Sequence, residues 1–135
     1  MSKVMSLENA IQMIKDGDCI ATSGICMSGV PEELMAGVER SFLETGKPSN
    51  LNMIFAAGQG CWDDIHAYEH MAHEGLVASV IGGHYGTCKS FGALIEENKM
   101  ELPQMLKIAS ELDVPIDIDT YMFPKTKGIK SDFKK

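Results

Sequence analysis

The sequence predicts an α/β fold, with an open, mostly parallel sheet and helices on both faces. Short apolar segments bounded by turn residues alternate along the chain with longer segments of helical periodicity. Strands that alternate with helices pair in parallel through right-handed crossovers. The 135 residues are enough for one domain with a real core. We therefore expect a single α/β domain over residues 1–135, with a basic tail at 125–135.

The first predicted elements are a helix and a buried strand. Ser6 can cap a helix over residues 7–15, where apolar residues recur every three or four positions, and Gly17 ends it. Residues 19–22 are short, apolar and bounded by turn residues, which favours a strand.

A longer helix and a second strand follow. Pro31 suits the first turn of this helix, Glu32 and Glu33 lie favourably at its positive end, and Gly46 ends it. The apolar segment 51–58 is predicted as the second strand.

The rest of the chain continues the alternation after an irregular segment at 59–65. The expected elements are a helix at 66–75, a strand at 76–84, helices at 88–98 and 102–112, and a last strand at 114–123. In a parallel sheet the loops that leave the carboxyl ends of the strands gather along one edge, where ligands usually bind.

The charge balance argues against two classes of partner. The formal net charge is −7, from 19 acidic and 12 basic residues. This is unlike a general nucleic-acid binder, which carries a basic stripe, and unlike a protein that docks on an anionic membrane. No apolar run approaches the roughly 18 residues of a membrane span.

Cysteine usage and the N-terminal segment indicate the cytoplasm. The four cysteines form no C-x-x-C unit, so a structural zinc site is not expected. The N-terminal segment is amphipathic and lacks the continuous apolar region of a signal peptide. Reduced thiols in the cytoplasm are the simplest explanation.

Glycine-containing turns follow three of the predicted strands. Their sequences are SGICMSGVP, AAGQG and VIGGHYG. Each one alone is weak evidence, but three at equivalent strand ends predict one open cleft lined by backbone groups.

Two nucleotide-binding motifs are excluded at these turns. Gly24 and Gly29 have the spacing of a phosphate-binding P-loop, but Val30 and Pro31 replace its lysine and hydroxyl residue. No G-x-G-x-x-G motif occurs either. Backbone N–H groups before a helix instead suit a carboxylate or a developing oxyanion.

Four histidines allow more than one interpretation. His66, His70 and His73 would share one face of a helix, either as a metal site or as a polar surface. We favour the polar surface, because three ligands on one helix do not easily converge on a single ion. His84 follows a strand and either donates to a substrate or is satisfied by backbone groups.

Nucleophilic catalysis has little support in the residues themselves. No Ser-His-Asp or Cys-His arrangement can be assigned. Cys26 and Cys61 lie in the candidate loops, either as reactive thiols of lowered pKa or, more commonly, as small apolar side chains in tight turns.

Several segments in order resemble a known enzyme family. They are SLENAIQMIKDGDCIATSG, SGVPEELMAGVERSFLETGKP, AAGQG, and HMAHEGLVASVIGGHYG through ENKMELPQ. Together they resemble the N-terminal half of family I CoA-transferases, most of all the acetate/propionate and 3-oxoacid type. The resemblance covers residues 6 to about 104, and its motifs come with suitable gaps.

The resemblance implies a transferase with two α/β halves that face each other across the active site. A glutamate of the second half attacks an acyl-CoA, and CoA then passes through a glutamyl thioester to a second carboxylic acid. The implied partners are a second half or subunit in an oligomer, with short-chain acyl-CoA and carboxylate substrates. The metabolism implied is that of ketone bodies and short-chain fatty acids, with CoA as a substrate and no cofactor or metal.

The resemblance also implies which residues of this chain contact substrate. None of them is catalytic. They are Ser23, Gly24, Ser28, Gly29, Gly58, Gln59, Gly60, Gly83 and His84.

The chain departs from the family pattern in several places. The family usually has Gly-Gly-Phe where this chain has Ser23, Gly24 and Ile25, the segment 100–104 is short, and the match fades beyond 106. The nucleophilic glutamate of the second half is missing, and Glu44 lies at a structural position. We expect no activity from the chain alone; the alternatives are a non-catalytic binding or scaffold domain, or a truncated, inactive fragment. An exposed apolar patch and self-association are also expected.

Overall fold

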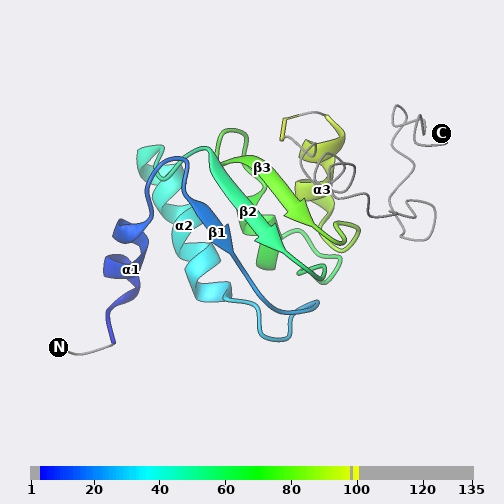
Figure 1. Cartoon of the computed structure of the whole chain (residues 1–135), viewed down its shortest axis with the longest axis horizontal. Coiled ribbons are helices and arrows are strands. Elements are labelled where there is room, and N and C mark those ends of the chain that lie inside the picture. The colour runs from blue at the N-terminus through cyan, green and yellow to red at the C-terminus, as the bar shows by residue number, and fades with distance from the viewer. Residues whose placement is uncertain (1–3, 98, 101–135) are drawn as a thin grey trace, which may run out of the picture.

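The computed structural model describes residues 4–97 and 99–100. Three parallel strands form one sheet in the order β1-β2-β3 (Figure 1). The strands are β1 (Cys19–Ala21), β2 (Leu51–Phe55) and β3 (Val77–Gly82). The helices are α1 (Leu7–Met13), α2 (Glu32–Thr45), the 3-10 helix η1 (Ala67–Met71) and α3 (Lys89–Glu96).

The predicted open parallel sheet of an α/β protein is confirmed. Helix and strand alternate as expected from α1 to α3. The expected helix at 102–112, strand at 114–123 and basic tail at 125–135 lie outside the described residues.

Local signals set the ends of the first two helices. Ser6 caps α1 by accepting a hydrogen bond from the N–H of Asn9 at 3.3 Å. The helix ends two residues earlier than predicted, because Ile14 is already extended (φ −78°, ψ 129°). Pro31 is the N-cap residue of α2, and Gly46 ends that helix in the left-handed conformation (φ 73°).

The helix predicted over 66–75 is wrong in type and length. Its place is taken by the five-residue 3-10 helix η1. Ala67 has a left-handed φ of 57°, and its N–H donates to Glu32 Oε2 at 2.8 Å instead of to a helical carbonyl. Tertiary contacts with α2 thus override the local preference for a longer helix.

The main core lies between the sheet and the helices on one of its faces. Leu51, Met53 and Phe55 alternate along β2 on this face, and all three are buried. Met35 and Val38 of α2 pack into the same cluster. A β-carbon on Gly82, the β3 partner of Phe55, would lie 2.5 Å from the Phe55 ring, so glycine makes room for the aromatic side chain.

An aromatic cluster supports the carboxyl edge of the sheet. Ring centroids lie 4.3 Å apart for Phe55 and Tyr68, and 5.0 Å apart for Tyr68 and Phe91. Tyr85 contacts both phenylalanines. The Tyr68 hydroxyl is within hydrogen-bond distance of the Thr22 hydroxyl (2.8 Å), which ties η1 to the end of β1. The loops at this edge therefore rest on a packed aromatic cluster.

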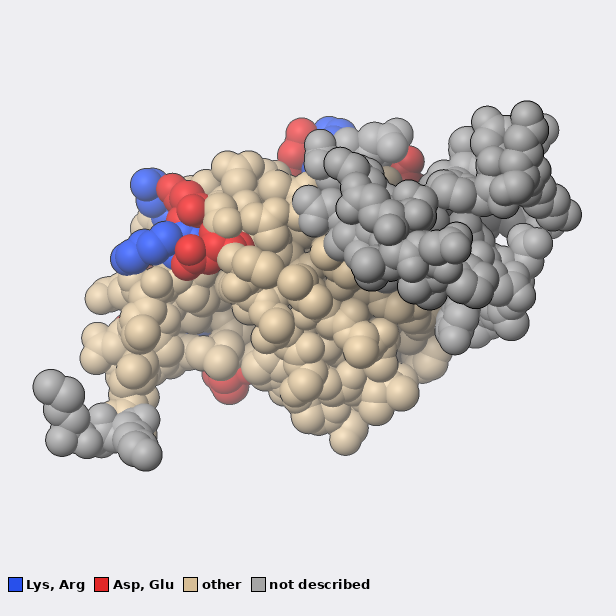
Figure 2. Space-filling model, in the orientation of Figure 1, with Lys and Arg blue, Asp and Glu red and all other residues tan. Residues whose placement is uncertain are grey.

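The opposite face of the sheet is open in the part of the chain that the structure describes. The side chains on this face are Cys19, Ala21, Asn52, Ile54, Ser79 and Ile81, all exposed or half-buried. Where Figure 2 leaves this face uncovered by grey atoms, the surface over β2 shows no Lys, Arg, Asp or Glu side chain. The helices predicted on this second face are not among the described residues, whereas parallel sheets are usually covered on both faces.

None of the helices within residues 4–97 and 99–100 is both long and apolar enough to cross a membrane.

Candidate functional site

Three loops meet at the carboxyl edge of the sheet, as the sequence predicts for this topology. The β1 loop (22–30) is joined to the β2 loop (56–66) by a hydrogen bond from Cys26 N–H to the Gly58 carbonyl at 2.8 Å. The β2 loop is joined to the β3 loop (83–88) by hydrogen bonds from Gly83 to Ala56 and from Trp62 to Thr87.

The β1 loop is built around a tight turn. The backbone groups of Ile25 and Ser28 exchange hydrogen bonds at 3.0 and 2.9 Å. Gly24 has a φ of 127°, and a β-carbon there would lie 2.8 Å from the Ser28 carbonyl oxygen, so only glycine fits. Among the described residues, the N–H groups of Met27 and Gly29 donate to no protein acceptor. These two donors are free to bind an oxyanion.

The start of α2 is a weaker anion site than the sequence suggests. Glu32 and Glu33 already place carboxylates in its first turn. An anionic ligand would be repelled there, so the turn offers the better donors.

Close packing explains the glycines of the other two loops. A β-carbon on Gly58 would lie 2.8 Å from the His84 ring, and one on Gly60 would lie 2.5 Å from Cys88 Sγ. A β-carbon on Gly83 would lie only 2.2 Å from the Ala56 carbonyl oxygen. The loops pack backbone against backbone, which side chains would prevent.

Gln59 is the most unusual residue of the β2 loop. Its side chain is 1% exposed, and neither its amide nitrogen nor its amide oxygen has a hydrogen-bond partner in the described structure. Leaving a buried polar group without a partner costs about 1–3 kcal/mol, so such a group marks a strained site, an ordered water or ion, or a functional contact.

His84 lies half-buried in the β3 loop, with its ring between Gly58 and Gly86. Neither ring nitrogen has a hydrogen-bond partner within residues 4–97 and 99–100. Of the two interpretations of His84, satisfaction by protein backbone is therefore not seen within the described residues, and donation to a substrate stays a prediction.

The structure brings the nine predicted site residues to one edge of the sheet. Ser23, Ser28 and Gly29 are exposed, Gly24, Gly83 and His84 are half-buried, and Gly58, Gln59 and Gly60 are buried. Their contact with substrate remains a prediction.

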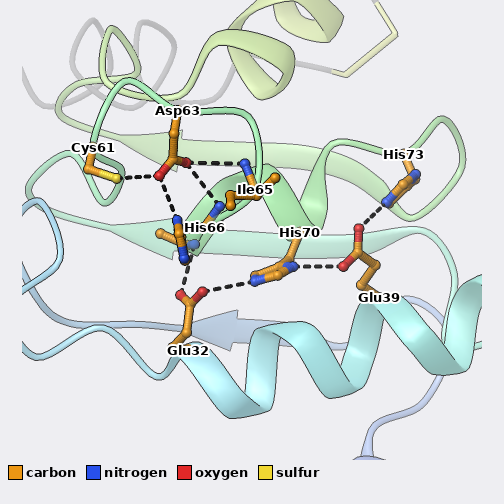
Figure 3. Close-up of polar contacts among 9 residues, drawn as sticks. Glu32, Glu39, Cys61, Asp63, Ile65, His66, His70 and His73 are labelled. Carbon is orange, nitrogen blue, oxygen red and sulfur yellow. Dashed lines mark hydrogen bonds and ion pairs between the residues drawn. The ribbon is translucent and has the colours of Figure 1, made fainter.

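The three histidines proposed as a metal site do not converge on one point. His70 lies between two carboxylates of α2, with Nδ1 2.7 Å from Glu39 and Nε2 3.0 Å from Glu32 (Figure 3). His73 Nε2 lies 2.6 Å from the other oxygen of Glu39, while His66 pairs with Asp63. Two acceptors around one imidazole require both ring nitrogens to donate, so His70 is protonated in this arrangement.

The reactive-thiol interpretation of Cys61 is not supported. Its thiol donates to Asp63 Oδ2 at 2.7 Å, and this hydrogen bond raises the pKa of Cys61. The hydrogen bond from the Cys61 thiol and the one from the His66 ring both lower the pKa of Asp63. Cys88 is buried, which raises the pKa of its thiol to about 11, and it donates to the Gln59 carbonyl at 2.9 Å.

Stability is expected to be greatest at mildly acidic pH. Burial opposes the charged form of His70, but Glu39 and Glu32 outweigh it and raise its pKa above the ordinary 6.5. This contribution is complete below pH 6.5 and is lost as pH rises through the raised pKa. Burial likewise opposes ionisation of Glu39, but His73 and His70 outweigh it and lower its pKa below the ordinary 4.5. That contribution is complete above pH 4.5 and is lost in acid.

Urea unfolding at a series of pH values from 4 to 9 measures how the free energy of unfolding depends on pH. The free energy of unfolding of the His70→Gln variant should fall less between neutral and alkaline pH than that of the unchanged protein. An unaltered pH profile in the variant would show that the pairing adds nothing.

The sequence does not predict two side-chain arrangements that the structure shows: a helix cap made by a distant residue and a cluster of possible metal ligands. Glu69 is 5% exposed and accepts hydrogen bonds from the N–H groups of Ser90 and Phe91, so it caps α3 from another helix. No local pattern indicates this contact. Cys61 and Asp63, in the segment predicted only as irregular, form a cluster with His66, the first residue of the predicted helix at 66–75.

Grooves elsewhere in the described residues lie along α1. One of about 280 Å³ separates α1 from α2, and another of about 490 Å³ extends toward Pro48. No residue of the three loops lines either groove.

The parallel sheet, with three packed glycine loops at its carboxyl edge, defines an α/β domain whose loops gather at the edge where ligands usually bind. Comparison with known proteins confirms the resemblance to CoA-transferases. The chain is 29% identical over 142 aligned positions to caffeate CoA-transferase from Acetobacterium woodii, which takes in 96% of this chain and 27% of that protein. No protein-family model matches the chain.

Solved structures of a CoA-transferase have the same fold. The acyl-CoA transferase YdiF from Escherichia coli matches in its apoenzyme form with a TM-score of 0.61 and 28% identity, over 72% of this chain and 19% of that chain. Its thioester complex with CoA matches with a TM-score of 0.59 and 27% identity, over 71% of this chain and 20% of that chain. The chain is thus related to CoA-transferases and spans about a quarter of the length of the curated relative.

Proposed function

We propose that this chain forms the acyl- and carboxylate-binding part of a CoA-transferase that moves CoA between an acyl-CoA and a short carboxylic acid. The observation that carries this proposal is the meeting of three glycine loops at one edge of the sheet, where the buried amide of Gln59 has no hydrogen-bond partner among the described residues. The relationship to CoA-transferases supports it. CoA is a substrate, and the reaction needs no cofactor.

The reacting glutamate belongs to a second half of the enzyme, on a separate chain or on a longer version of this one. Its carboxylate attacks the thioester carbonyl and expels the CoA thiolate, which gives an acyl-glutamyl anhydride. The thiolate then attacks the glutamyl carbonyl and releases the first carboxylic acid, so that a glutamyl-CoA thioester forms. A second carboxylate then takes the CoA from that thioester. This chain supplies hydrogen-bond donors to the oxygen that becomes negative: the Gln59 amide, His84 and the N–H groups of Met27 and Gly29.

Exposed apolar side chains favour a partner surface beside these loops. Ile25 and Met27 of the β1 loop are 60% and 38% exposed, and Trp62 and Ile65 of the β2 loop are 61% and 64% exposed. They would be covered by the second half in an oligomer. The four cysteines are free, which suits the cytoplasm, and a role in ketone-body or short-chain fatty-acid metabolism follows from the proposed substrates.

The direct test mixes this chain with the second half of a related CoA-transferase. Acetyl-CoA and a short carboxylate are the substrates, and formation of the new acyl-CoA is measured by chromatography. Transfer is expected from the mixture and from neither protein alone. A folded, associated pair without transfer would overturn the proposal and favour a non-catalytic binding domain or an inactive fragment.

Single substitutions then locate the site within an active mixture. Gln59→Ala should lower kcat about 100-fold, the usual effect of losing one oxyanion donor. Glu74→Gln, at an exposed position, is the matched control and should leave kcat unchanged.

A further inference from the structure

One turn of the β2 loop gathers three side chains of the kind that bind metal ions. Cys61 Sγ lies 2.7 Å from Asp63 Oδ2, and His66 Nδ1 lies 2.5 Å from the same oxygen (Figure 3). The three donor atoms all lie within 4.8 Å of one another. They come from a segment of only six residues, so one local conformation brings them together.

The backbone of this turn fixes the central carboxylate. Asp63 Oδ1 accepts hydrogen bonds from the N–H groups of Ile65 and His66, both at 3.1 Å. Trp62 adopts a left-handed φ of 61°, and its N–H is held by the Thr87 carbonyl of the β3 loop at 3.0 Å. The second oxygen, Oδ2, is thereby turned toward the thiol and the imidazole. Hydrogen bonds that orient a carboxylate in this way are typical of the residues around metal sites.

We propose that Cys61, Asp63 and His66 bind a divalent transition-metal ion of the zinc class. The ion replaces the two protons that now lie between these donors: the thiol proton of Cys61 leaves to solvent, and the proton on Nδ1 of His66 is exchanged for one on Nε2, so that a neutral imidazole binds through Nδ1. A thiolate, an imidazole and a carboxylate together suit Zn²⁺ or Co²⁺ and not Mg²⁺ or Ca²⁺, which prefer oxygen ligands only.

The present spacing needs only a small adjustment to hold such an ion. Zinc bonds of about 2.0–2.3 Å place tetrahedral ligand atoms roughly 3.2–3.8 Å apart, so the side chains must separate by about 1 Å. The side chains of Asp63 and His66 are 32% and 41% exposed, so they have room to move and the ion can enter from solvent. Three protein ligands leave a fourth position for water or an anionic ligand.

This site is independent of the proposed CoA transfer and of the three-histidine site that the sequence disfavours. It uses only one of those three histidines. His70 and His73 are paired with the carboxylates of α2, so they are not available to the same ion.

The test is a titration of the full 135-residue chain with Co²⁺ under reducing conditions, followed by visible and near-ultraviolet absorption. We expect saturation at one ion per chain, with a sulfur-to-cobalt charge-transfer band and the strong visible bands of tetrahedral cobalt. Zn²⁺ should displace the cobalt and abolish both. The absence of a saturable signal at micromolar cobalt from folded protein would overturn the proposal.

Variants assign the ligands. Cys61→Ser should remove the charge-transfer band, while Asp63→Asn and His66→Gln should each weaken binding by more than about tenfold, the lower end of what losing even an outer hydrogen-bond partner costs. Cys19→Ser and His73→Gln are the matched controls and should bind as the unchanged protein does. A band that survives Cys61→Ser, or is lost in either control, would overturn the assignment.

Discussion

Replacing Gly83 with alanine is expected to destabilise the protein by about 2–4 kcal/mol and to separate the β3 loop from the β2 loop. The new β-carbon would lie 2.2 Å from the Ala56 carbonyl oxygen, a backbone atom that no side-chain rotation can move away. Overpacking of this kind costs about 1–3 kcal/mol, and the hydrogen bond from Gly83 to Ala56 (3.2 Å), worth about 1 kcal/mol, would be broken as well. Urea unfolding measures the loss.

Gly92→Ala is the matched control for this substitution. Gly92 lies inside α3, and a β-carbon there would meet nothing closer than the Tyr85 carbonyl oxygen at 3.9 Å. Since glycine is unfavourable within a helix, the control should gain about 0.5–1 kcal/mol. Equal stability of Gly83→Ala and the unchanged protein would contradict the close approach of the two loops.

The sequence predicts those parts of the fold that local signals determine. Helix α2 begins one residue after Pro31 and ends just before Gly46, close to the ends that the sequence predicts. Each of these two residues sets a helix end through the φ angle that it prefers, so no distant contact is needed. The meeting of the three glycine loops is also predictable, since a parallel topology brings the carboxyl ends of the strands to one edge.

The rest depends on contacts between residues far apart in the sequence. The helix predicted at 66–75 is replaced by η1, whose His70 is held by Glu32 and Glu39 from more than 30 positions away. The burial of Gln59 without partners is likewise a tertiary property.

The cluster of Cys61, Asp63 and His66 differs from these tertiary features, because its residues lie close together in the sequence. The pattern C-x-D-x-x-H is visible in the sequence from Cys61 to His66. Its spacing is not that of one helix face, and Cys61 and Asp63 lie in the segment predicted only as irregular, so the pattern alone does not predict that the three side chains converge. A left-handed Trp62 produces the convergence, and aromatic residues rarely adopt that conformation.

Replacing Glu69 with alanine is expected to destabilise the protein by about 2–3 kcal/mol and to fray the start of α3. Cys88, the N-cap residue of α3, makes no side-chain capping bond. Glu69 performs this role from η1: its Oε2 accepts from the N–H of Ser90 at 3.0 Å and from that of Phe91 at 3.3 Å. Loss of a cap costs about 0.5–2 kcal/mol, and hydrogen bonds to a charged acceptor are worth about 1.5–3 kcal/mol. Urea unfolding measures the total loss.

Two further variants separate capping from other effects of the substitution. Glu69→Gln keeps one oxygen acceptor and should lose less stability than Glu69→Ala. Glu74→Ala removes an exposed carboxylate whose ion pair in the described part of the chain is with Lys99, and it should change stability by less than about 0.5 kcal/mol. Amide hydrogen exchange gives the local readout: Ser90 and Phe91 should exchange faster in Glu69→Ala, while β2 keeps its protection relative to global unfolding. Unchanged exchange at these two amides would mean that α3 is held by the packing of Phe91 alone, since that side chain is fully buried.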